Sequence, residues 1–225
     1  MKGSFTGRDI LRHVDHTLLR PTATLSEVEA LVEEAILYKT ASVCIPPMFV
    51  KPVKAKYKQA ISICTVIGFP LGYASMEAKI FETKQALLDG ADEIDMVIPL
   101  GLVKAQEFDC IEQEIRQIKE VCANRILKVI VETCYLNETE KVKIAQVVTT
   151  GGADFIKTST GFGTGGATVA DVELLKQAVG PKVAVKAAGG LRTIEDLAAM
   201  LKAGATRLGA SAAVGLLKDH LDEEF

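Results

Sequence analysis

Two lysines and an aspartate stand where the sequence otherwise predicts buried strands. Lys157 follows the apolar pair Phe155–Ile156, and Lys186 lies in the apolar segment 183–188. Asp95 alternates with apolar neighbours in a third such segment, so its side chain faces the side opposite to theirs. Burying a charged group is costly unless the group is paired or loses its charge. These three residues are therefore candidates for chemistry.

A lysine in such a setting is suited to nucleophilic catalysis by its amine. A free lysine has a pKa of about 10.4, so very little of it is neutral at pH 7. Desolvation and a neighbouring ammonium both favour the neutral form, which condenses with a carbonyl to a Schiff base. The Schiff base is an electron sink for breaking or forming a carbon–carbon bond, and a carboxylate with a second lysine can move the protons. The residues alone do not decide whether Lys157 or Lys186 is the nucleophile.

The segments that must position these side chains recur along the chain in a regular alternation. Apolar, strand-like stretches end at polar or turn-forming residues, and most are followed by stretches with helical spacing. Pairs such as Thr24 with Glu27 have the spacing of a capping box and mark where helices begin. The expected strands are 16–19, 42–45, 61–67, 93–98, 127–131, 155–157, 182–187 and 206–209.

Eight such strand–helix units predict a closed barrel. The strands are almost continuously apolar, which is typical of parallel strands covered on both faces, and eight of them can close on themselves. We therefore predict an α/β fold, a single-domain (β/α)8 TIM barrel over residues 1–225, with residues 1–13 as a lead-in. One long helix is expected between the fourth strand and Val121, and a last helix over 212–220. An open, doubly wound sheet is the alternative.

The active sites of such barrels lie at the C-terminal ends of the strands, and those ends hold further candidates. Thr17 and Cys44 lie in the first two expected strands, and Asp15 lies next to the first. The loops after strands seven and eight contain Gly189–Gly190 and Gly209–Ala210–Ser211. Loops at these two places are a common phosphate site in barrels, because glycine lets backbone N–H groups approach the anion.

Two other patterns indicate chemistry that the rest of the sequence does not support. Residues 161–166 match the G-x-G-x-x-G pattern of dinucleotide sites, but no acidic residue ends the next strand to hold a ribose. We interpret them as a loop that covers the substrate. His13 and His16 lie near Asp15, yet no third histidine is close in sequence, so no metal or other cofactor is predicted.

Composition narrows the class of protein further. The 225 residues carry a net charge of −3, which predicts no basic surface for nucleic acid. The five cysteines form no C-x-x-C pair, which indicates reduced thiols in a cytoplasmic protein. No apolar signal-peptide segment occurs in the first ten residues. Glycine and proline interrupt the longest apolar run, 61–74, so no membrane span is expected.

Four stretches together resemble the family of deoxyribose-phosphate aldolases. They are residues 14–19, 93–97, 155–161 and 185–193. The order Lys-Thr-Ser-Thr-Gly followed by Lys-x-x-Gly-Gly is highly specific, and the resemblance extends from about residue 14 to 217. It implies the same eight-stranded barrel that the alternation of elements predicts.

The resemblance implies a class I aldolase, which works through a lysine Schiff base. Such enzymes reversibly cleave 2-deoxy-D-ribose 5-phosphate to D-glyceraldehyde 3-phosphate and acetaldehyde, without a metal or other cofactor, in deoxynucleoside catabolism. By this resemblance Lys157 forms the Schiff base, while Lys186 lowers its pKa and moves protons together with Asp95. Thr160 and Gly161, in the same motif, would contact the substrate. The implied partners are a sugar phosphate and an aldehyde, and the implied state is a cytoplasmic homo-oligomer, a dimer or a tetramer.

The chain departs from the family pattern at two places that bear on phosphate selection. Phe162 stands where some relatives have a lysine, and no tyrosine follows Tyr135, although some relatives carry one in a tail that reaches the site. Cys44 matches a position near the family's site, as a core thiol or as a thiol that reacts with aldehyde products. Two alternatives stay open: another lysine-dependent sugar-phosphate aldolase or transaldolase, and a non-catalytic barrel that binds sugar phosphates.

Overall fold

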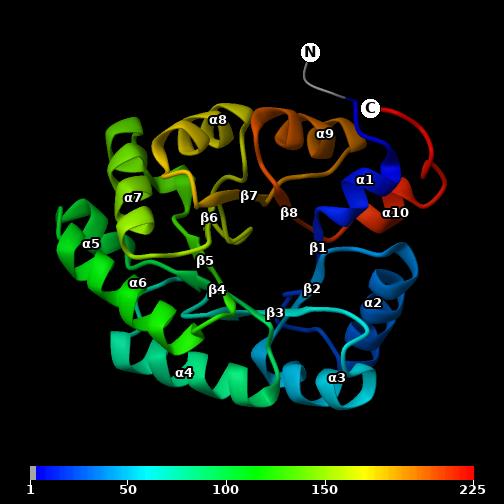
Figure 1. Ribbon diagram of the computed structural model, residues 1–225, viewed down its shortest axis with the longest axis horizontal. Coiled ribbons are helices and arrows are strands. Elements are labelled where there is room, and N and C mark those ends of the chain that lie inside the picture. Colours follow the sequence, from blue (N-terminus) through cyan, green and yellow to red (C-terminus); the bar gives the residue numbers. More distant parts are fainter. Residues whose placement is uncertain (1–3) are drawn as a thin grey trace.

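The computed structural model describes residues 4–225, which form one closed barrel of eight parallel strands surrounded by helices (Figure 1). The strands are β1 (Val14–Thr17), β2 (Ser42–Ile45), β3 (Ile63–Ile67), β4 (Glu93–Val97), β5 (Ile126–Ile130), β6 (Phe155–Lys157), β7 (Ala184–Ala188) and β8 (Arg207–Ala210). Each strand pairs with its neighbours in sequence order, and β8 pairs with β1 to close the sheet. The predicted (β/α)8 TIM barrel is confirmed, and the open sheet is wrong.

Helices cover the outer face of the barrel (Figure 1). They are α1 (Gly7–Arg12), α2 (Leu25–Tyr38), α3 (Val50–Tyr57), α4 (Met76–Asp89), α5 (Leu100–Lys104), α6 (Phe108–Cys122), α7 (Glu138–Thr150), α8 (Val169–Ala178), α9 (Ile194–Ala203) and α10 (Ala213–Leu217), with 3-10 turns η1 (Pro47–Phe49) and η2 (Thr133–Tyr135). Within residues 4–225, none of these helices is both long and apolar enough to cross a bilayer.

Helices begin where a side chain satisfies the free N–H groups of the first turn. Thr24 with Glu27 forms a complete capping box at α2, as the sequence predicts. Asn137 with Glu140 forms another at α7. At the opposite end, Gly90 closes α4 with a φ of 107°, a left-handed conformation that glycine adopts without a steric penalty. Local residues therefore set where the chain leaves each helix and enters the next strand.

The structure corrects the expected ends of the first strand and the last helix. β1 runs from Val14 to Thr17 where 16–19 was expected, so Leu18 and Leu19 lie beyond the strand. The last helix, α10, is shorter than the expected 212–220 and ends before the C-terminal tail.

The single helix expected before Val121 is in fact two, α5 and α6. The chain turns between them at Gln106, whose φ is 61°. A left-handed residue cannot continue a right-handed helix, which explains the break. Sequence spacing alone does not reveal this turn, because Gln106 is an ordinary helix former.

The two ends of the described chain lie side by side (Figure 1). Phe5 N donates to Phe225 O at 3.2 Å, and Phe225 N donates to Phe5 O at 2.9 Å. The predicted lead-in, residues 1–13, contains α1, which packs against α10. Residues 1–3 of that lead-in lie outside the described part.

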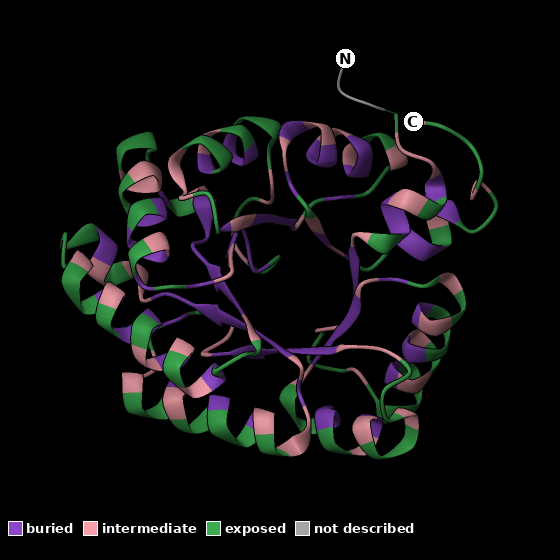
Figure 2. Ribbon diagram, in the orientation of Figure 1, coloured by how far each residue is buried: buried purple, intermediate pink, exposed green. Residues whose placement is uncertain are grey.

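The apolar core lies between the strands and the helices. Outward-facing strand residues such as Ile94, Val129 and Val185 are fully buried there, and the strands are largely buried (Figure 2). The inward-facing positions differ, because alternation turns polar and sulfur-containing side chains into the barrel. These polar and sulfur-containing side chains include Asp15, Ser42, Cys44, Cys64, Glu93, Asp95, Lys128, Lys157, Lys186 and Arg207. The fold therefore separates an apolar layer outside the barrel from a charged interior.

Candidate active site

Asp95 holds two lysine ammonium groups inside the barrel. Its Oδ2 accepts a hydrogen bond from Lys157 Nζ at 2.8 Å and from Lys186 Nζ at 2.7 Å. Lys157 ends β6 and lies in register with Lys186 of β7, while Asp95 reaches both from β4. The three residues singled out for chemistry are thus brought together in one cluster.

This cluster belongs to a larger network. Six ionisable residues from five strands form a closed cycle of alternating charge, here called the charge ring. In order around the cycle they are Asp95, Lys186, Asp15, Arg207, Glu93 and Lys128. Each member contacts an opposite charge on both sides, so the charge ring has three positive and three negative members and is neutral when all six are ionised. The sequence analysis missed Lys128, Glu93 and Arg207.

Lys128 is a third buried lysine in the barrel. Its Nζ lies 2.8 Å from Asp95 Oδ1 and 2.6 Å from Glu93 Oε2, and its side chain is fully buried. Lys128 stands between Leu127 and Val129 in β5, which is the alternation that marked Asp95. The signal that would have found Lys128 was therefore present in the sequence.

Arg207 closes the charge ring near the start of β8. Its Nη1 donates to Asp15 Oδ1 at 2.5 Å and to Glu93 Oε2 at 2.9 Å. Its guanidinium lies 5.4 Å from the centroid of the Phe155 ring, a cation–π contact. Asp15, which also accepts from Lys186 Nζ, was expected to bind substrate. It is fully buried instead, as a structural member of the charge ring.

The charge ring sets the ionisation of its members. Burial disfavours the charged form of Lys186, but the carboxylates of Asp15 and Asp95 outweigh burial and raise the pKa of Lys186 above its ordinary value. Burial also opposes the ionisation of Asp95, yet the three lysines around it, led by Lys128, hold the pKa of Asp95 well below its ordinary value. The two lysines expected to meet therefore do so, at one oxygen of Asp95, and the negative charge of that carboxylate offsets the repulsion between their ammonium groups.

Lys157 stands outside the charge ring. Among residues 4–225 its ion-pair partner is Asp95, which Lys128 and Lys186 already share. Adding Lys157 to the charge ring gives four positive and three negative groups, 4 − 3 = +1, when all are ionised. An unbalanced buried charge is costly, and Lys157 is the one lysine of this cluster whose charge the charge ring does not balance. Lys157, at 3% exposure, is the one of the three lysines that is not completely buried.

A pocket of about 380 Å³ opens beside Lys157. The predicted substrate residues that line it are Thr17, Thr160, Gly161, Gly189, Gly190, Gly209 and Ser211. Asp15 and Cys44 were expected there too, but both are buried inside the barrel and do not line it. Lys157 is thus the member of the described charged cluster that reaches the pocket.

Glycines of the β7 loop shape one end of this pocket. Gly189 and Gly190 have φ values of 82° and 77°, which favour glycine. A Cβ on Gly189 would lie 3.2 Å from the Cα of Gly166 and 3.4 Å from the Cα of Gly161. The glycines at 161–166 therefore serve close packing between the β6 and β7 loops, which explains a G-x-G-x-x-G pattern without a dinucleotide.

Glu132, just beyond β5, anchors the β6 loop and was not predicted. Its carboxylate accepts from Thr160 N at 3.1 Å and also from Thr160 Oγ1. Glu132 is 3% exposed and has a φ of 50°, which is unusual for a residue other than glycine. A buried, strained carboxylate that holds a pocket residue indicates a positioning role. Nothing in the local sequence pattern marks it.

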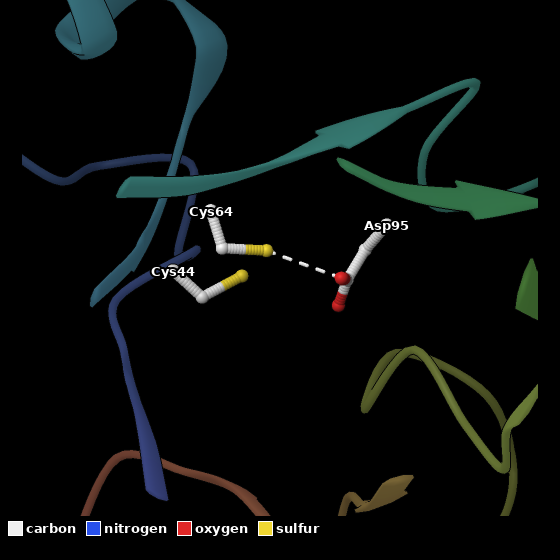
Figure 3. Close-up of side chains that lie close together, drawn as sticks. All are labelled: Cys44, Cys64 and Asp95. Carbon is white, nitrogen blue, oxygen red and sulfur yellow. Dashed lines mark hydrogen bonds between the residues drawn. The ribbon is translucent and has the colours of Figure 1, made fainter. Parts of the chain in front are cut away.

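Cys44 and Cys64 lie next to Asp95 on neighbouring strands (Figure 3). Cys64 Sγ donates to Asp95 Oδ1 at 3.1 Å, and ligand atoms of the three residues lie within 4.8 Å of one another. Lysine ammonium groups already contact both oxygens of Asp95, and Lys128 Nζ lies 3.2 Å from Cys64 Sγ. Burial also raises the pKa of the Cys64 thiol well above its ordinary value. This donor set therefore does not fit a divalent metal ion.

The two N-terminal histidines do not converge with Asp15. His16 Nε2 lies 2.9 Å from Glu34 Oε2, and His13 Nδ1 lies 2.8 Å from Thr206 O. Alternation along β1 turns His16 outward where Asp15 points inward.

Comparisons with known proteins identify the family. The sequence matches the model of the DeoC/LacD family of aldolases over residues 10–221. A deoxyribose-phosphate aldolase of Clostridium botulinum (strain Eklund 17B / Type B) is 57% identical over 210 residues, covering 93% of this chain and 95% of that protein. One of Clostridioides difficile (strain 630) is 50% identical over 213 residues, covering 95% and 97%.

A solved structure shows the same fold with moderate sequence identity. The tetrameric deoxyribose phosphate aldolase of Aeropyrum pernix superposes with a TM-score of 0.89 at 32% identity, covering 95% of this chain and 92% of that one. The family model, the two bacterial relatives and this structure each span nearly the whole chain. The chain therefore belongs to the DeoC/LacD family of aldolases.

Proposed function

We propose that this protein is a class I aldolase that reversibly cleaves 2-deoxy-D-ribose 5-phosphate to D-glyceraldehyde 3-phosphate and acetaldehyde. The observation that carries the proposal is the place of Lys157, which lines the pocket and adds one unmatched positive charge to a neutral buried ring. A lysine amine that lines a pocket can, in its neutral form, attack an aldehyde that enters it. The names of relatives at 50% and 57% identity support this substrate.

In the proposed reaction Lys157 Nζ is the nucleophile. It attacks C1 of the open-chain sugar, and the aldehyde oxygen leaves as water, which gives an iminium ion. The C3 hydroxyl then loses its proton, the C2–C3 bond breaks, and the electron pair moves to the iminium nitrogen. The products of this step are D-glyceraldehyde 3-phosphate and the enamine of acetaldehyde on Lys157.

We assign the proton transfers to Asp95 and Lys186. The enamine gains a proton at its terminal carbon, which balances the proton lost from the C3 hydroxyl, and water then releases acetaldehyde. Asp95 Oδ2 lies 2.8 Å from Lys157 Nζ and 2.7 Å from Lys186 Nζ, so Asp95 contacts the reacting nitrogen and Lys186 contacts Asp95. A carboxylate with a neighbouring ammonium can pass a proton in either direction, as a reversible reaction requires.

The phosphate group would lie at the end of the pocket formed by the β7 and β8 loops. Gly189 and Gly190 line this end, where glycine allows backbone N–H groups to approach an anion, and Ser211, which also lines it, carries a hydroxyl. Thr17 and Thr160 line the same pocket and are suited to contact the sugar hydroxyls.

Borohydride reduction in the presence of acetaldehyde tests the proposal. A Schiff base is reduced to a stable ethyl adduct, and peptide mass spectrometry should locate it on Lys157. The Lys157→Ala variant is the matched control and should remain unmodified. No adduct on the wild type would favour a non-catalytic sugar-phosphate barrel. Trapping only with ketose donors would favour a different lysine aldolase or a transaldolase.

A chelator separates this proposal from metal-dependent chemistry. Because no step requires a metal ion, turnover should be unchanged after treatment with EDTA. Loss of activity that returns with a divalent metal would contradict the lysine mechanism.

We also propose that the protein is a cytoplasmic homo-oligomer, a dimer or a tetramer. Large apolar side chains are exposed, among them Tyr73, Phe81 and Leu88, and the Aeropyrum pernix relative is a tetramer. All five cysteines are free, which suits a reducing compartment. Light scattering of the purified protein and fractionation of the cells that produce it test the two statements. A monomeric mass or a secreted protein would contradict them.

A further inference from the structure

The rim of the pocket carries a cation that the reaction steps above do not use. Arg20 lies just beyond β1 and lines the same pocket as Lys157. Among the pocket-lining residues described, Arg20 and Lys157 are the only charged ones, and none is acidic. An anionic group that enters the pocket would therefore meet Arg20 as its one positive partner besides the nucleophile.

Arg20 lies on the side of the barrel where the glycine loops lie. Closure of the barrel pairs β1 with β8, and β8 pairs with β7. The loops that follow these three strands are consecutive around the rim. Arg20 thus neighbours the loops of Ser211 and of Gly189–Gly190, whereas Lys157 enters the pocket from β6.

The first turn of α2 holds the Arg20 side chain at the rim. Arg20 Nη2 donates to Glu27 Oε1, and the same carboxylate accepts from Thr24 N at 2.9 Å through Oε2. The capping box of α2 therefore also orients the guanidinium. Within residues 4–225 the guanidinium of Arg20 forms this one hydrogen bond, to Glu27, which uses one of its five N–H donors. The side chain is 48% exposed, so the remaining donors can reach a ligand.

The β6 loop adds no cation at the rim beyond Lys157 itself. Phe162, on this loop, lines the pocket and packs edge-on against Phe69, with ring centroids 5.4 Å apart. The other β6-loop residues that line the pocket, Thr160 and Gly161, are uncharged. An anion in the pocket would therefore be drawn toward the Arg20 side.

We propose that Arg20 is the specificity-determining residue that recognises the substrate phosphate by charge. This inference rests on the proposed function and extends it. The N–H groups of Gly189 and Gly190 and the hydroxyl of Ser211 offer hydrogen bonds from neutral donors. Arg20 adds a charge-assisted contact, which is stronger and is lost when the ligand has no phosphate. Glu27 is a positioning residue in this arrangement.

The test compares cleavage of 2-deoxy-D-ribose 5-phosphate with cleavage of 2-deoxy-D-ribose. In Arg20→Met, kcat/KM for the phosphorylated sugar should fall roughly 10- to 100-fold. For the unphosphorylated sugar it should stay within about twofold of wild type, because the reacting groups are untouched. The Arg20→Lys variant keeps the charge but not the planar guanidinium. Its kcat/KM for the phosphorylated sugar should lie between those of wild type and Arg20→Met. Inhibition by inorganic phosphate should weaken in parallel.

Arg12→Met is the matched control. Arg12 is also an exposed arginine that pairs with a carboxylate, Asp9, but it lies on α1 and does not line the pocket. This variant should behave as wild type with both sugars. Equal losses on both sugars in Arg20→Met, or no loss on the phosphorylated one, would overturn the role of Arg20. A wild-type protein that cleaves neither sugar would overturn the proposed function itself.

Discussion

Two buried lysine–carboxylate clusters in this protein show opposite pKa shifts. Between α4 and α6, Lys79 pairs with Glu114 at 3.0 Å, and burial lowers the pKa of Lys79 and raises that of Glu114. Inside the barrel, Lys186 is just as buried, yet the carboxylates of Asp15 and Asp95 raise its pKa. Both clusters contain the same types of groups in the same protein.

The number of contacting counter-charges accounts for the difference. Lys79 contacts one carboxylate and the carbonyl oxygen of Val97, at 2.9 Å, which do not outweigh desolvation. Each member of the charge ring contacts two opposite charges, and around Lys186 and Lys128 the carboxylates together outweigh burial. A lysine inside the charge ring is therefore held in its charged form. The proposed mechanism places the reactive amine outside the charge ring, on Lys157.

The largest expected effect tests directly whether the lysine outside the charge ring differs in role from those inside it. Lys157→Ala should lower turnover by at least about 10⁴-fold, because it removes the nucleophile. It should leave the urea midpoint of unfolding unchanged or higher, because the neutral charge ring remains intact. Steady-state kinetics and urea denaturation measure the two quantities. Activity near that of wild type would show that Lys157 is not the nucleophile.

Lys186→Leu breaks the charge ring at the residue next to the nucleophile. Turnover should fall by roughly 10² to 10⁴-fold through the loss of a proton carrier. With one of its lysines gone, the lowered pKa of Asp95 should rise, so the acid limb of the pH–rate profile should move to higher pH. A pH–rate profile of the same shape and position as that of wild type would contradict this role.

Lys128→Met and Lys79→Met compare the two clusters in stability. Removing Lys128 takes one positive partner from each of two buried carboxylates, Asp95 and Glu93, and the free energy of unfolding at pH 7 should fall by about 3–5 kcal/mol. Removing Lys79 should cost less, about 1–2 kcal/mol, because the pKa of Glu114 is already raised and its carboxyl can take up a proton. Urea denaturation of both variants provides the comparison. Equal losses of unfolding free energy in the two variants would mean that a lysine of the charge ring contributes no more to stability than the lysine of the isolated Lys79–Glu114 pair.

The smallest expected effect is a pH dependence of the stability difference between wild type and Lys128→Met. The pKa of Asp95 is lowered in the folded protein, so its contribution to stability is present above its unfolded pKa, near 4, and is lost as the pH falls further. The stability gap between wild type and Lys128→Met should therefore narrow as the pH falls below about 4. Urea denaturation at pH 7 and pH 3.5 measures it. A constant gap would show that Asp95 is not the group that Lys128 stabilises.

Much of the site could be predicted because its residues break a local pattern. Asp95 and Lys157 are charged residues in apolar strands, and Lys128 carries the same signal. Arg207 could not be singled out in this way, because a polar residue at the start of a strand is ordinary. Glu132 could not be predicted from the sequence either, because its role depends on Thr160, in a loop 28 positions further along the chain.

By itself, the sequence determined the eight alternating strands and helices, their capping and the positions of the unusual lysines, because these depend on spacing between near neighbours. Only the tertiary structure decided which charges meet. Closure of β8 on β1 brings Arg207 to Asp15 across 192 positions, and alternation turns seven charged side chains, the charge ring and Lys157, into one water-poor interior. There each charge needs an opposite partner, so the neutrality of the charge ring, and the single amine left over at the pocket, belong to the closed barrel and to no segment of it.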